Sequence, residues 1–242
     1  MRILVACECS GTVREAFRAR GHDAWSCDIL PAVDGSPFHL QGDVLFALKE
    51  GNGFYFKALK KHTRWDMMIA HPPCDFLTNS AAWAYADPNF EKYPGVGYHQ
   101  QVKRGTLTGA CRRDAREKAV EFFLSLWNCG IKRVCLENPI GFMNTLPAMG
   151  GIRPQIIQPY EFGDDASKAT CLWLKGLPPL RPTKRLPGRI VEWKGKKVER
   201  WSNQTDSGQN NLTPSGNRAG VRAVTYPGIA QAMADQWPSP AL

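Results

Sequence analysis

The segment Trp65-Asp66-Met67-Met68-Ile69-Ala70-His71-Pro72-Pro73-Cys74 decides the fold class of this 242-residue chain. Its apolar run, residues 65–70, is typical of a strand that is buried on both faces of a parallel sheet. Proline fixes its own φ angle and restricts the residue before it, so Cys74 follows this strand on a stiff loop. Open α/β sheets bind their ligands at the carboxyl ends of the strands, and we expect Cys74 to lie there.

A second apolar strand, residues 131–136, ends in Glu137-Asn138-Pro139. One strand end therefore offers a nucleophile and the other offers a carboxylate. This pair suits covalent attack on a base that must be protonated as it is attacked. A free cysteine is most often a small buried hydrophobe. The proline pair before Cys74 and the matching Glu-Asn-Pro favour a chemical role instead.

The remainder of the first 140 residues alternates between strand-like and helix-like patterns. Residues 2–7 and 23–27 read as buried strands, and residues 12–20, 44–61 and 114–129 read as helices. Alternation of this kind predicts a doubly wound α/β domain.

Two regions break the alternation. Residues 84–110 form a long loop punctuated by Gly and Pro, of a length that is usually functional or disordered. Residues 175–222 are basic and rich in Pro and Gly, with one predicted hairpin at 189–201 that turns at 194–196. A polar, loose stretch follows at 202–217, and a final helix is predicted at 229–237.

Composition narrows the class of partner and the compartment. The chain carries 31 Lys and Arg against 22 Asp and Glu, a net charge of +9, which favours a polyanion such as nucleic acid. Its eight cysteines form no C-x-x-C pair, which predicts reduced thiols in a cytosol. We expect no signal peptide, no membrane span and no metal, because His71 and Cys74 supply only half of a zinc site.

These residues resemble DNA cytosine-5 methyltransferases of the short type found in bacteriophage genomes. Pro72-Pro73-Cys74-Asp75-Phe76-Leu77-Thr78 is similar to the family segment Pro-Pro-Cys-Gln-x-Phe-Ser, with Asp75, Leu77 and Thr78 as departures. The resemblance implies a Rossmann-like doubly wound sheet of the S-adenosylmethionine-dependent type, with a small basic hairpin or loop appendage. It divides the chain into a catalytic domain (1–174), a reduced recognition region (175–222) and a closing helix that packs back on the catalytic domain (223–242).

The resemblance also implies catalytic roles. The Cys74 thiolate would add to carbon 6 of cytosine, so that carbon 5 accepts the methyl group of S-adenosylmethionine, and Glu137 would protonate ring N3. Glu137 must then hold a proton near neutral pH, which burial beside a base favours. The Cys74 pKa, ordinarily about 8.5, must be lowered by nearby cations or a helix N-terminus.

A third catalytic residue follows from the segment after Tyr160-Glu161-Phe162-Gly163, which resembles the family turn Tyr-Gly-Val-Pro-Gln-x-Arg-x-Arg. In register, Ala166 replaces the Gln, Lys168 the first Arg and Thr170 the second. An ammonium cannot reproduce the two-pronged hydrogen bonds of a guanidinium. Lys168 is therefore the one cation that this turn would bring to the base.

Cofactor contacts are implied at three strand ends and at the proline pair. The turn Glu8-Cys9-Ser10-Gly11-Thr12 resembles the one that receives the methionine end, because N–H groups opening a helix can face a carboxylate. Asp28 is placed to bind the ribose hydroxyls and Asp43 the adenine amino group. The closing helix, which begins near Tyr226-Pro227-Gly228, would cover the cofactor. The implied contact residues are Cys9, Ser10, Gly11, Thr12, Asp28, Ile29, Asp43, Val44 and Pro72.

The implied partner is double-stranded DNA, bound by a monomer. Because 175–222 is too short for a full recognition domain, we expect a short or relaxed target and affinity dominated by phosphate contacts. The hairpin tryptophans, Trp193 and Trp201, fit either a groove reader or a ribbon with one packed face. The expected phosphate contacts are Lys184, Arg185, Arg189, Lys194, Lys196 and Lys197.

Three alternatives stay open. A methyltransferase acting on exocyclic amino groups would need Asp, Asn or Ser before its proline pair and an aromatic residue after it, and His71 and Cys74 count against that. A catalytically impaired cofactor-binding or DNA-binding remnant is favoured only by the altered turn at 166–170. Methylation of a free pyrimidine nucleotide is compatible with the reduced recognition region, although the charge of +9 disfavours it.

Overall fold

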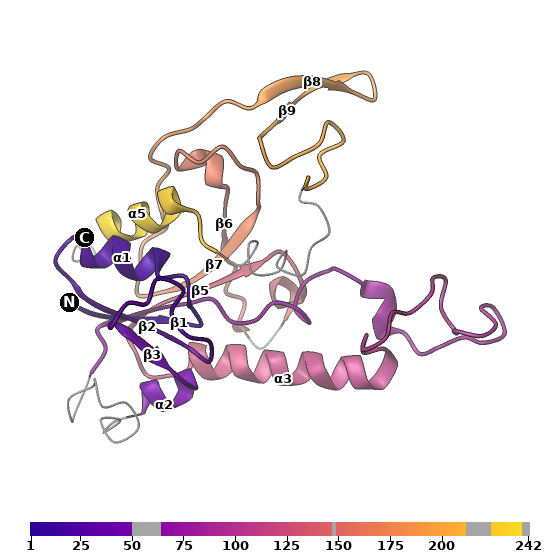
Figure 1. Ribbon diagram of the computed structural model, residues 1–242, viewed down its shortest axis with the longest axis horizontal. Coiled ribbons are helices and arrows are strands. Elements are labelled where there is room, and N and C mark those ends of the chain that lie inside the picture. Colours follow the sequence, from indigo (N-terminus) through magenta and orange to yellow (C-terminus); the bar gives the residue numbers. More distant parts are fainter. Residues whose placement is uncertain (50–63, 147–148, 212–223, 239–242) are drawn as a thin grey trace.

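The computed structural model describes residues 1–49, 64–146, 149–211 and 224–238. Within them, a seven-stranded, mostly parallel sheet has the strand order β3-β2-β1-β4-β5-β7-β6, with helices on both faces (Figure 1). The predicted α/β class is confirmed. The parallel strands are β1 (Arg2–Ala6), β2 (Asp23–Asp28), β3 (His39–Gln41), β4 (Met67–Ala70) and β5 (Arg133–Pro139).

The far edge of the sheet reverses direction. β7 (Thr170–Lys175) pairs antiparallel with β5, and β6 (Gln155–Ile157) pairs antiparallel with β7. An antiparallel strand starts at the edge where its neighbour ends. The chain entering β7 therefore passes the carboxyl end of β5, which brings a late segment of the sequence to the edge where ligands of such sheets bind.

Helices cover both faces of the sheet. Helices α1 (Thr12–Arg18) and α5 (Pro227–Gln236) lie against one face, and α2 (Val44–Leu48) and the long α3 (Gly109–Trp127) lie against the other (Figure 1). Short 3-10 helices occur at η2 (Ala82–Tyr85), η3 (Phe142–Thr145) and η5 (Pro159–Glu161). No helix of the described residues is long and apolar enough to cross a membrane.

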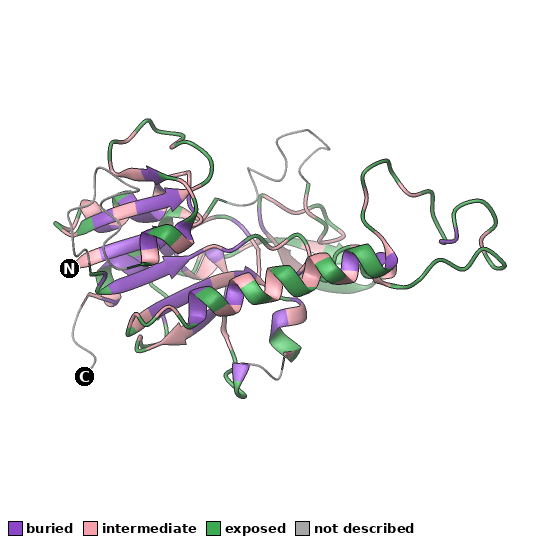
Figure 2. Cartoon of the chain, turned by 90° about the horizontal axis from the view of Figure 1, so that it is seen from below, coloured by how far each residue is buried: buried purple, intermediate pink, exposed green. Residues whose placement is uncertain are grey.

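Alternating residues of the central strands feed two separate cores. In β1, Ile3 and Val5 pack with the α1 and α5 side, whereas Leu4 and Ala6 pack with the α2 and α3 side. The β4 residues divide in the same way, and Figure 2 shows the sheet buried along its centre. Burial on both faces is why these strands carry unbroken apolar runs.

Several predicted element boundaries differ from the structure. The helix predicted at 44–61 ends at Leu48, where Lys49 is already extended, and residues 50–61 of that prediction lie outside the described residues. Helix α3 begins at Gly109, earlier than the predicted Asp114. Helix α1 ends at Arg18, and Gly21 follows with a positive φ of 80° that L-residues with a side chain rarely adopt.

The predicted basic hairpin is confirmed as a separate two-stranded sheet that projects from the main one (Figure 1). It consists of β8 (Arg189–Trp193) and β9 (Lys196–Arg200). The turn is Lys194-Gly195, with φ angles of 51° and 71°. Two positive φ angles are what the tight two-residue turn of a twisted hairpin requires, so the turn is one residue shorter than the sequence predicted.

Candidate functional site

The order of the strands reverses between β1 and β4. From β1 the chain adds β2 and β3 on one side, and from β4 it adds β5 on the other. Such a switch point opens a crevice at the carboxyl ends of the two strands, where doubly wound sheets bind ligands. The His71 N–H donates to the Ala6 carbonyl at 3.0 Å, so the segments that follow β1 and β4 start side by side.

The two strand ends that carry Cys74 and Glu137 are neighbours. β4 and β5 pair in parallel register, with Ala70 opposite Leu136. The next residues meet directly: His71 Nδ1 donates to Glu137 Oε2 at 3.1 Å, and their side chains are only 8% and 14% exposed. The structure thus brings both strand ends together and adds a partner, His71, that the sequence analysis had not paired with the carboxylate.

A second hydrogen bond joins the segments that follow β4 and end β5. The Asn138 side-chain amide donates to the Pro72 carbonyl at 2.9 Å. His71 Nε2 and Asn138 Oδ1 are buried and have no hydrogen-bond partner in the structure. Buried polar atoms are normally satisfied. Two orphaned atoms beside Cys74 and Glu137 are what a site for a polar ligand would leave.

Gly141 sets how closely the loop after Glu137 approaches the loop after Cys74. The Phe142 N–H donates to the Leu77 carbonyl at 2.7 Å, and Gly141 bridges to Thr78. A Cβ at position 141 would lie 2.0 Å from the Leu77 oxygen. The φ of Gly141 is extended, so its constraint is steric contact with the neighbouring loop.

Gly141→Ala is therefore expected to force the two loops apart and to destabilise the fold by about 1–3 kcal/mol, as overpacking does. Thermal unfolding measures the loss. Gly105→Ala is the control, since its Cβ meets nothing within 4 Å and only its φ of +82° is unfavourable. A Gly141→Ala variant as stable as Gly105→Ala would show that the loops adapt without cost.

Lys168 reaches the same edge through the antiparallel strand. Thr170, the first residue of β7, stands opposite Pro139, so the turn before it lies at the carboxyl end of β5. The Lys168 N–H donates to Gln158 Oε1 at 2.9 Å. Ala166 and Thr170 are each 4% exposed and pack into the structure. The turn therefore brings one cation, Lys168, toward Cys74 and Glu137.

Burial and the charges of the site together favour the protonated thiol of Cys74 and the ionised carboxylate of Glu137. The pKa of Cys74 is raised by burial and by the charges of Asp75 and Glu137, which together outweigh Lys168. Burial raises the pKa of Glu137 too, but the hydrogen bond and charge of His71 and the charge of Lys168 outweigh it, so the pKa is lowered. Both directions are opposite to the expectation of a lowered thiol pKa and a protonated carboxyl.

The turn after β1 holds its own carboxylate. Glu8 is 5% exposed, and its oxygens accept from the Val13 N–H at 2.8 Å and the Arg14 N–H at 3.3 Å. The Ser10 hydroxyl donates to Glu8 at 3.2 Å. Glu8 therefore occupies the N–H groups of Val13 and Arg14, and the expected ligand contacts of residues 9–12 stay a prediction. The signal was present in the sequence as an acid placed just before a helix.

The acids expected to bind the cofactor gather at the ends of β2 and β3. Asp28 Oδ1 accepts from the Leu30 N–H and Asp43 Oδ1 from the Leu45 N–H, each at 2.9 Å. Burial, and then Asp28, Cys27 and Asp43, raise the pKa of the Cys7 thiol, which lies among them.

The other residues expected at the cofactor divide into exposed and buried ones. Ile29 is 73% exposed beside Asp28. Val44 is 4% exposed and belongs to the core on the α2 side, so the structure gives it a packing role. Pro72 and Gly11 are buried, Gly11 takes a positive φ of 77°, and Cys9, Ser10 and Thr12 are half-buried near it. Gly11 has the left-handed conformation that the tight turn requires.

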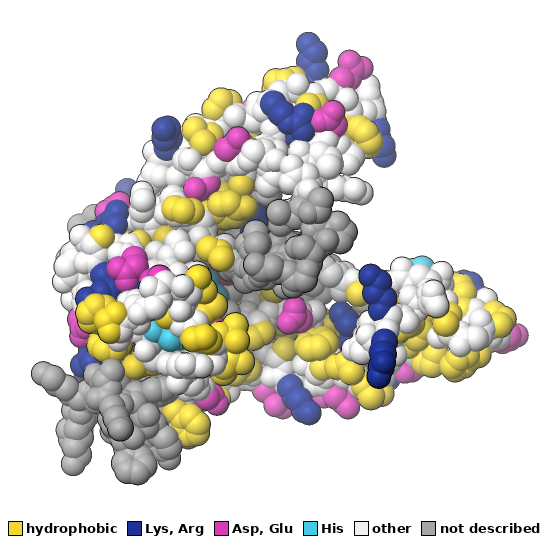
Figure 3. All heavy atoms as spheres, viewed as in Figure 1, with side chains coloured by type: hydrophobic (Ala, Val, Ile, Leu, Met, Phe, Trp, Pro, Cys, Tyr) yellow, Lys and Arg dark blue, Asp and Glu magenta, His cyan; other side chains and the backbone are white. Residues whose placement is uncertain are grey.

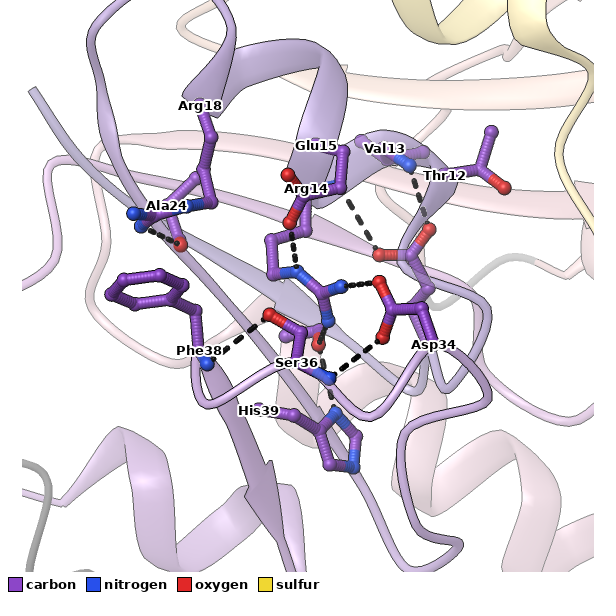
Figure 4. A network of polar contacts seen from close by, with 12 residues as sticks. Thr12, Val13, Arg14, Glu15, Arg18, Ala24, Asp34, Ser36, Phe38 and His39 are labelled. Carbon is purple, nitrogen blue, oxygen red and sulfur yellow. Dashed lines mark hydrogen bonds and ion pairs between the residues drawn. The ribbon is translucent and has the colours of Figure 1, made fainter.

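A buried arginine, which the sequence analysis missed, anchors loop 29–38 beside this turn. Arg14 is fully buried and binds the Ser26 hydroxyl at 2.6 Å, the Asp34 carboxylate and Glu15 (Figure 4). The Val33 N–H donates to the Cys9 carbonyl at 2.9 Å, which completes the attachment of the loop to the end of β1.

The six residues expected to contact phosphate are all exposed on or before the hairpin, but they are not equivalent. Arg185 forms an ion pair with Glu199 and Arg189 forms one with Asp206. Figure 3 shows acidic side chains among the basic ones there. The described segment 184–211 holds seven basic and three acidic residues. The positive charge that remains comes mainly from Lys184, Lys194, Lys196 and Lys197.

The two tryptophans of the hairpin have different surroundings. Trp201 is 7% exposed and stacks on Tyr160, with ring centroids 3.9 Å apart and an angle of 8° between the planes. Trp193 is 39% exposed near the turn. Trp201 therefore fastens the base of the hairpin to η5, as expected for a ribbon with one packed face.

No protein-family model matches the sequence, and no curated protein matches it. Among solved structures, the chain is similar to one from E. coli described as a candidate DNA modification methyltransferase encoded within a prophage, with 14% identity and a TM-score of 0.46. The similarity covers 78% of this chain and 52% of that chain. This chain thus spans about half the length of that protein.

Proposed function

We propose that this protein is a DNA cytosine-5 methyltransferase that uses S-adenosylmethionine. The observation that carries the proposal is the bond between His71 and Glu137, which joins the ends of two neighbouring parallel strands and brings the loop of Cys74 to the edge where Glu137 lies. Lys168 enters the same edge from β7. A nucleophile, an acid and a cation within one crevice suit addition to an electron-poor ring.

In this proposal the Cys74 sulfur forms a bond to carbon 6 of cytosine while Glu137 gives a proton to ring N3. Carbon 5 then attacks the methyl group, and the cofactor sulfur leaves as a neutral thioether. Water takes the proton from carbon 5, the bond between carbon 6 and the Cys74 sulfur breaks to restore the ring, and N3 returns its proton to Glu137. S-adenosylmethionine supplies a methyl group activated by a positively charged sulfur.

Glu137 has to become protonated when the substrate binds. His71 and Lys168 keep the carboxylate ionised in the free protein. A base that covers the pair removes it from water, and desolvation raises a carboxyl pKa. Lys168 is the cation of this edge that favours the thiolate of Cys74.

The residues at the ends of β1 to β3 fit the cofactor. S-adenosylmethionine presents an ammonium, ribose hydroxyls and an adenine amino group, all of which need acceptors. Asp28 and Asp43 each bind a backbone N–H through Oδ1, and Ile29 offers exposed apolar surface beside Asp28. We assign the ribose to Asp28 and the adenine amino group to Asp43.

Asp28→Ala is expected to weaken binding of S-adenosylmethionine about 10- to 100-fold, since a hydrogen bond to a charged group contributes about 1.5–3 kcal/mol. Calorimetry with purified protein measures it. Asp23→Ala is the matched control, because Asp23 begins the same strand at its opposite end, where it pairs with Arg2. Equal affinities for the two variants would remove Asp28 from the cofactor site.

The proposed activity is tested by bisulfite sequencing of DNA from cells that make the protein, with mass analysis of the digested nucleosides. We expect 5-methylcytosine. N4-methylcytosine or N6-methyladenine would assign the protein to the exocyclic class instead. Methylation of free cytidine nucleotides in preference to DNA would assign the protein to nucleotide metabolism. If no substrate gave a methylated product, the protein would be assigned a binding role without catalysis.

DNA binding by the hairpin is expected to depend steeply on salt. Replacing Lys184, Lys194, Lys196 and Lys197 with Ala should reduce the slope of log affinity against log salt by up to about 3–4, because each phosphate contact contributes about 0.9. The Arg185→Ala, Arg189→Ala double variant should change the slope less, since both side chains are already ion-paired. The methylated cytosines should stay the same. Salt-insensitive binding would place DNA on another surface.

A further inference from the structure

The segment that follows the hairpin lies against the turn that carries Lys168. The side chain of Asn203 binds both backbone groups of Ser167: the Ser167 N–H donates to Oδ1, and Nδ2 donates to the Ser167 carbonyl, each at 2.9 Å. Beside it, the Ser202 N–H donates to Asp165 Oδ1 at 3.1 Å. We call these contacts, between residues 165–167 and 202–203, the seam.

On its other side, the same turn is held by Gln158. Its Oε1 accepts from the Lys168 N–H at 2.9 Å and from the Ser167 hydroxyl at 3.5 Å. The backbone immediately before Lys168 is thus fixed between two side-chain amides that come from different parts of the chain. An amide that binds both the N–H and the carbonyl of one residue fixes its orientation as well as its distance.

The hairpin side of the seam is itself tied down. Trp201 stacks on Tyr160 and donates from its indole N–H to the Leu186 carbonyl at 3.2 Å. The Asn211 side chain donates to the Ser202 carbonyl at 2.7 Å, and its backbone N–H donates to the Asn203 carbonyl at 3.0 Å. Asn203 therefore projects from a folded loop directly after β9, and any displacement of the hairpin base reaches Ser167 through it.

We propose that Asn203 is a positioning residue for Lys168, and that through Ser167 it couples the basic hairpin to the edge where Cys74 and Glu137 meet. Three features carry this: the paired bonds to Ser167, the antiparallel β7 that delivers this turn to the end of β5, and the direct continuity of Asn203 with β9. The coupling to DNA rests on the proposed function. DNA binding by the hairpin would then influence, through Asn203, the position of the Lys168 ammonium relative to the Cys74 thiol.

The test measures how fast iodoacetamide alkylates Cys74 as a function of pH, in the full chain without DNA or cofactor, with peptide mass analysis to separate the thiols. Lys168 favours the thiolate of Cys74, so Lys168→Met is expected to move the midpoint to higher pH. Asn203→Ala should move it in the same direction by at least half as much. A rise of half a pKa unit slows alkylation below the midpoint about threefold.

Gln209→Ala is the matched control, because it removes an exposed amide from the same loop and leaves the bonds of Asn203 and Asn211 intact. Its profile should match the wild type. Cys135, which is fully buried in β5, reports unfolding in every sample. If Asn203→Ala exposes Cys135, Asn203→Leu replaces it, since leucine keeps the volume and removes both bonds.

Two results would overturn the proposal: an Asn203 variant whose Cys74 profile matches the wild type, or a Lys168→Met variant whose profile does not move. A merely structural role would lower the melting temperature and leave the midpoint where it is. Methyl transfer is assayed separately, so a wild type that transfers no methyl group would defeat the proposed function and leave the alkylation result standing.

Discussion

The Cys74→Ser variant is expected to lose methyl transfer completely while it binds S-adenosylmethionine as tightly as the wild type. A serine hydroxyl does not ionise near neutral pH unless a strong base takes its proton, and Glu137 is engaged by His71. The Cys74 side chain is half-buried, and the smaller oxygen should fit in its place without disturbing the loop. Transfer of a labelled methyl group to DNA is the measurement.

Cys111→Ser is the control for this variant, since Cys111 is an exposed thiol on α3 and should be dispensable. DNA that contains 5-fluorocytosine should form a covalent complex with the wild type and with Cys111→Ser, because fluorine cannot leave carbon 5 as a proton does. No such complex should form with Cys74→Ser. Appreciable turnover by Cys74→Ser would mean that another group is the nucleophile.

The second large effect is expected for Glu137→Gln, which should keep its fold and its affinity for cofactor but lose about 10²- to 10⁴-fold in turnover, the usual contribution of a positioned acid. The amide oxygen can still accept from His71, so the geometry of the strand ends is preserved. What is lost is the group that delivers a proton to N3. Single-turnover methylation measures the chemical step directly.

Glu117→Gln serves as its control, because Glu117 is an exposed residue of α3. A loss of less than about threefold in Glu137→Gln would reduce Glu137 to a structural strand end. His71 gives a further check. In His71→Phe the Glu137 pKa should rise, since the hydrogen bond that lowers it is gone, and the limb on which activity falls with rising pH should move to higher pH.

The central strands could be predicted because burial on two faces leaves an unbroken apolar run, which β1, β4 and β5 all show. β3 and β6 are three residues each and too short to produce a periodic pattern. The early start of α3 was missed because Gly109 disfavours a helix, whereas in the structure Arg113 of the first turns is held by Asp87. Tertiary contacts decide such boundaries more than propensity does.

In the candidate site, too, features set by local sequence could be predicted and features set by tertiary contacts could not. Cys74 and Glu137 could be located because each follows a recognisable strand, and parallel neighbours end at one edge. The His71 contact depends on the register between two strands, and the Asn203 contact joins residues 36 apart in the chain. Neither contact produces a recognisable pattern in the local sequence. The ionisation of Glu137 was anticipated wrongly for the same reason, because its direction is set by His71 and Lys168.

The buried Arg14 has a consequence for how a ligand exchanges. To swing loop 29–38 away from the end of β1, the chain would have to separate Asp34 from a fully buried guanidinium, which would keep Glu15 as a carboxylate partner. Removing a partner from a buried charge is costly. We therefore expect that wall of the crevice to open rarely, and ligand exchange to take place on the side of the Cys74 loop. Weakening the Arg14 contact should then alter exchange rates without altering the chemical step.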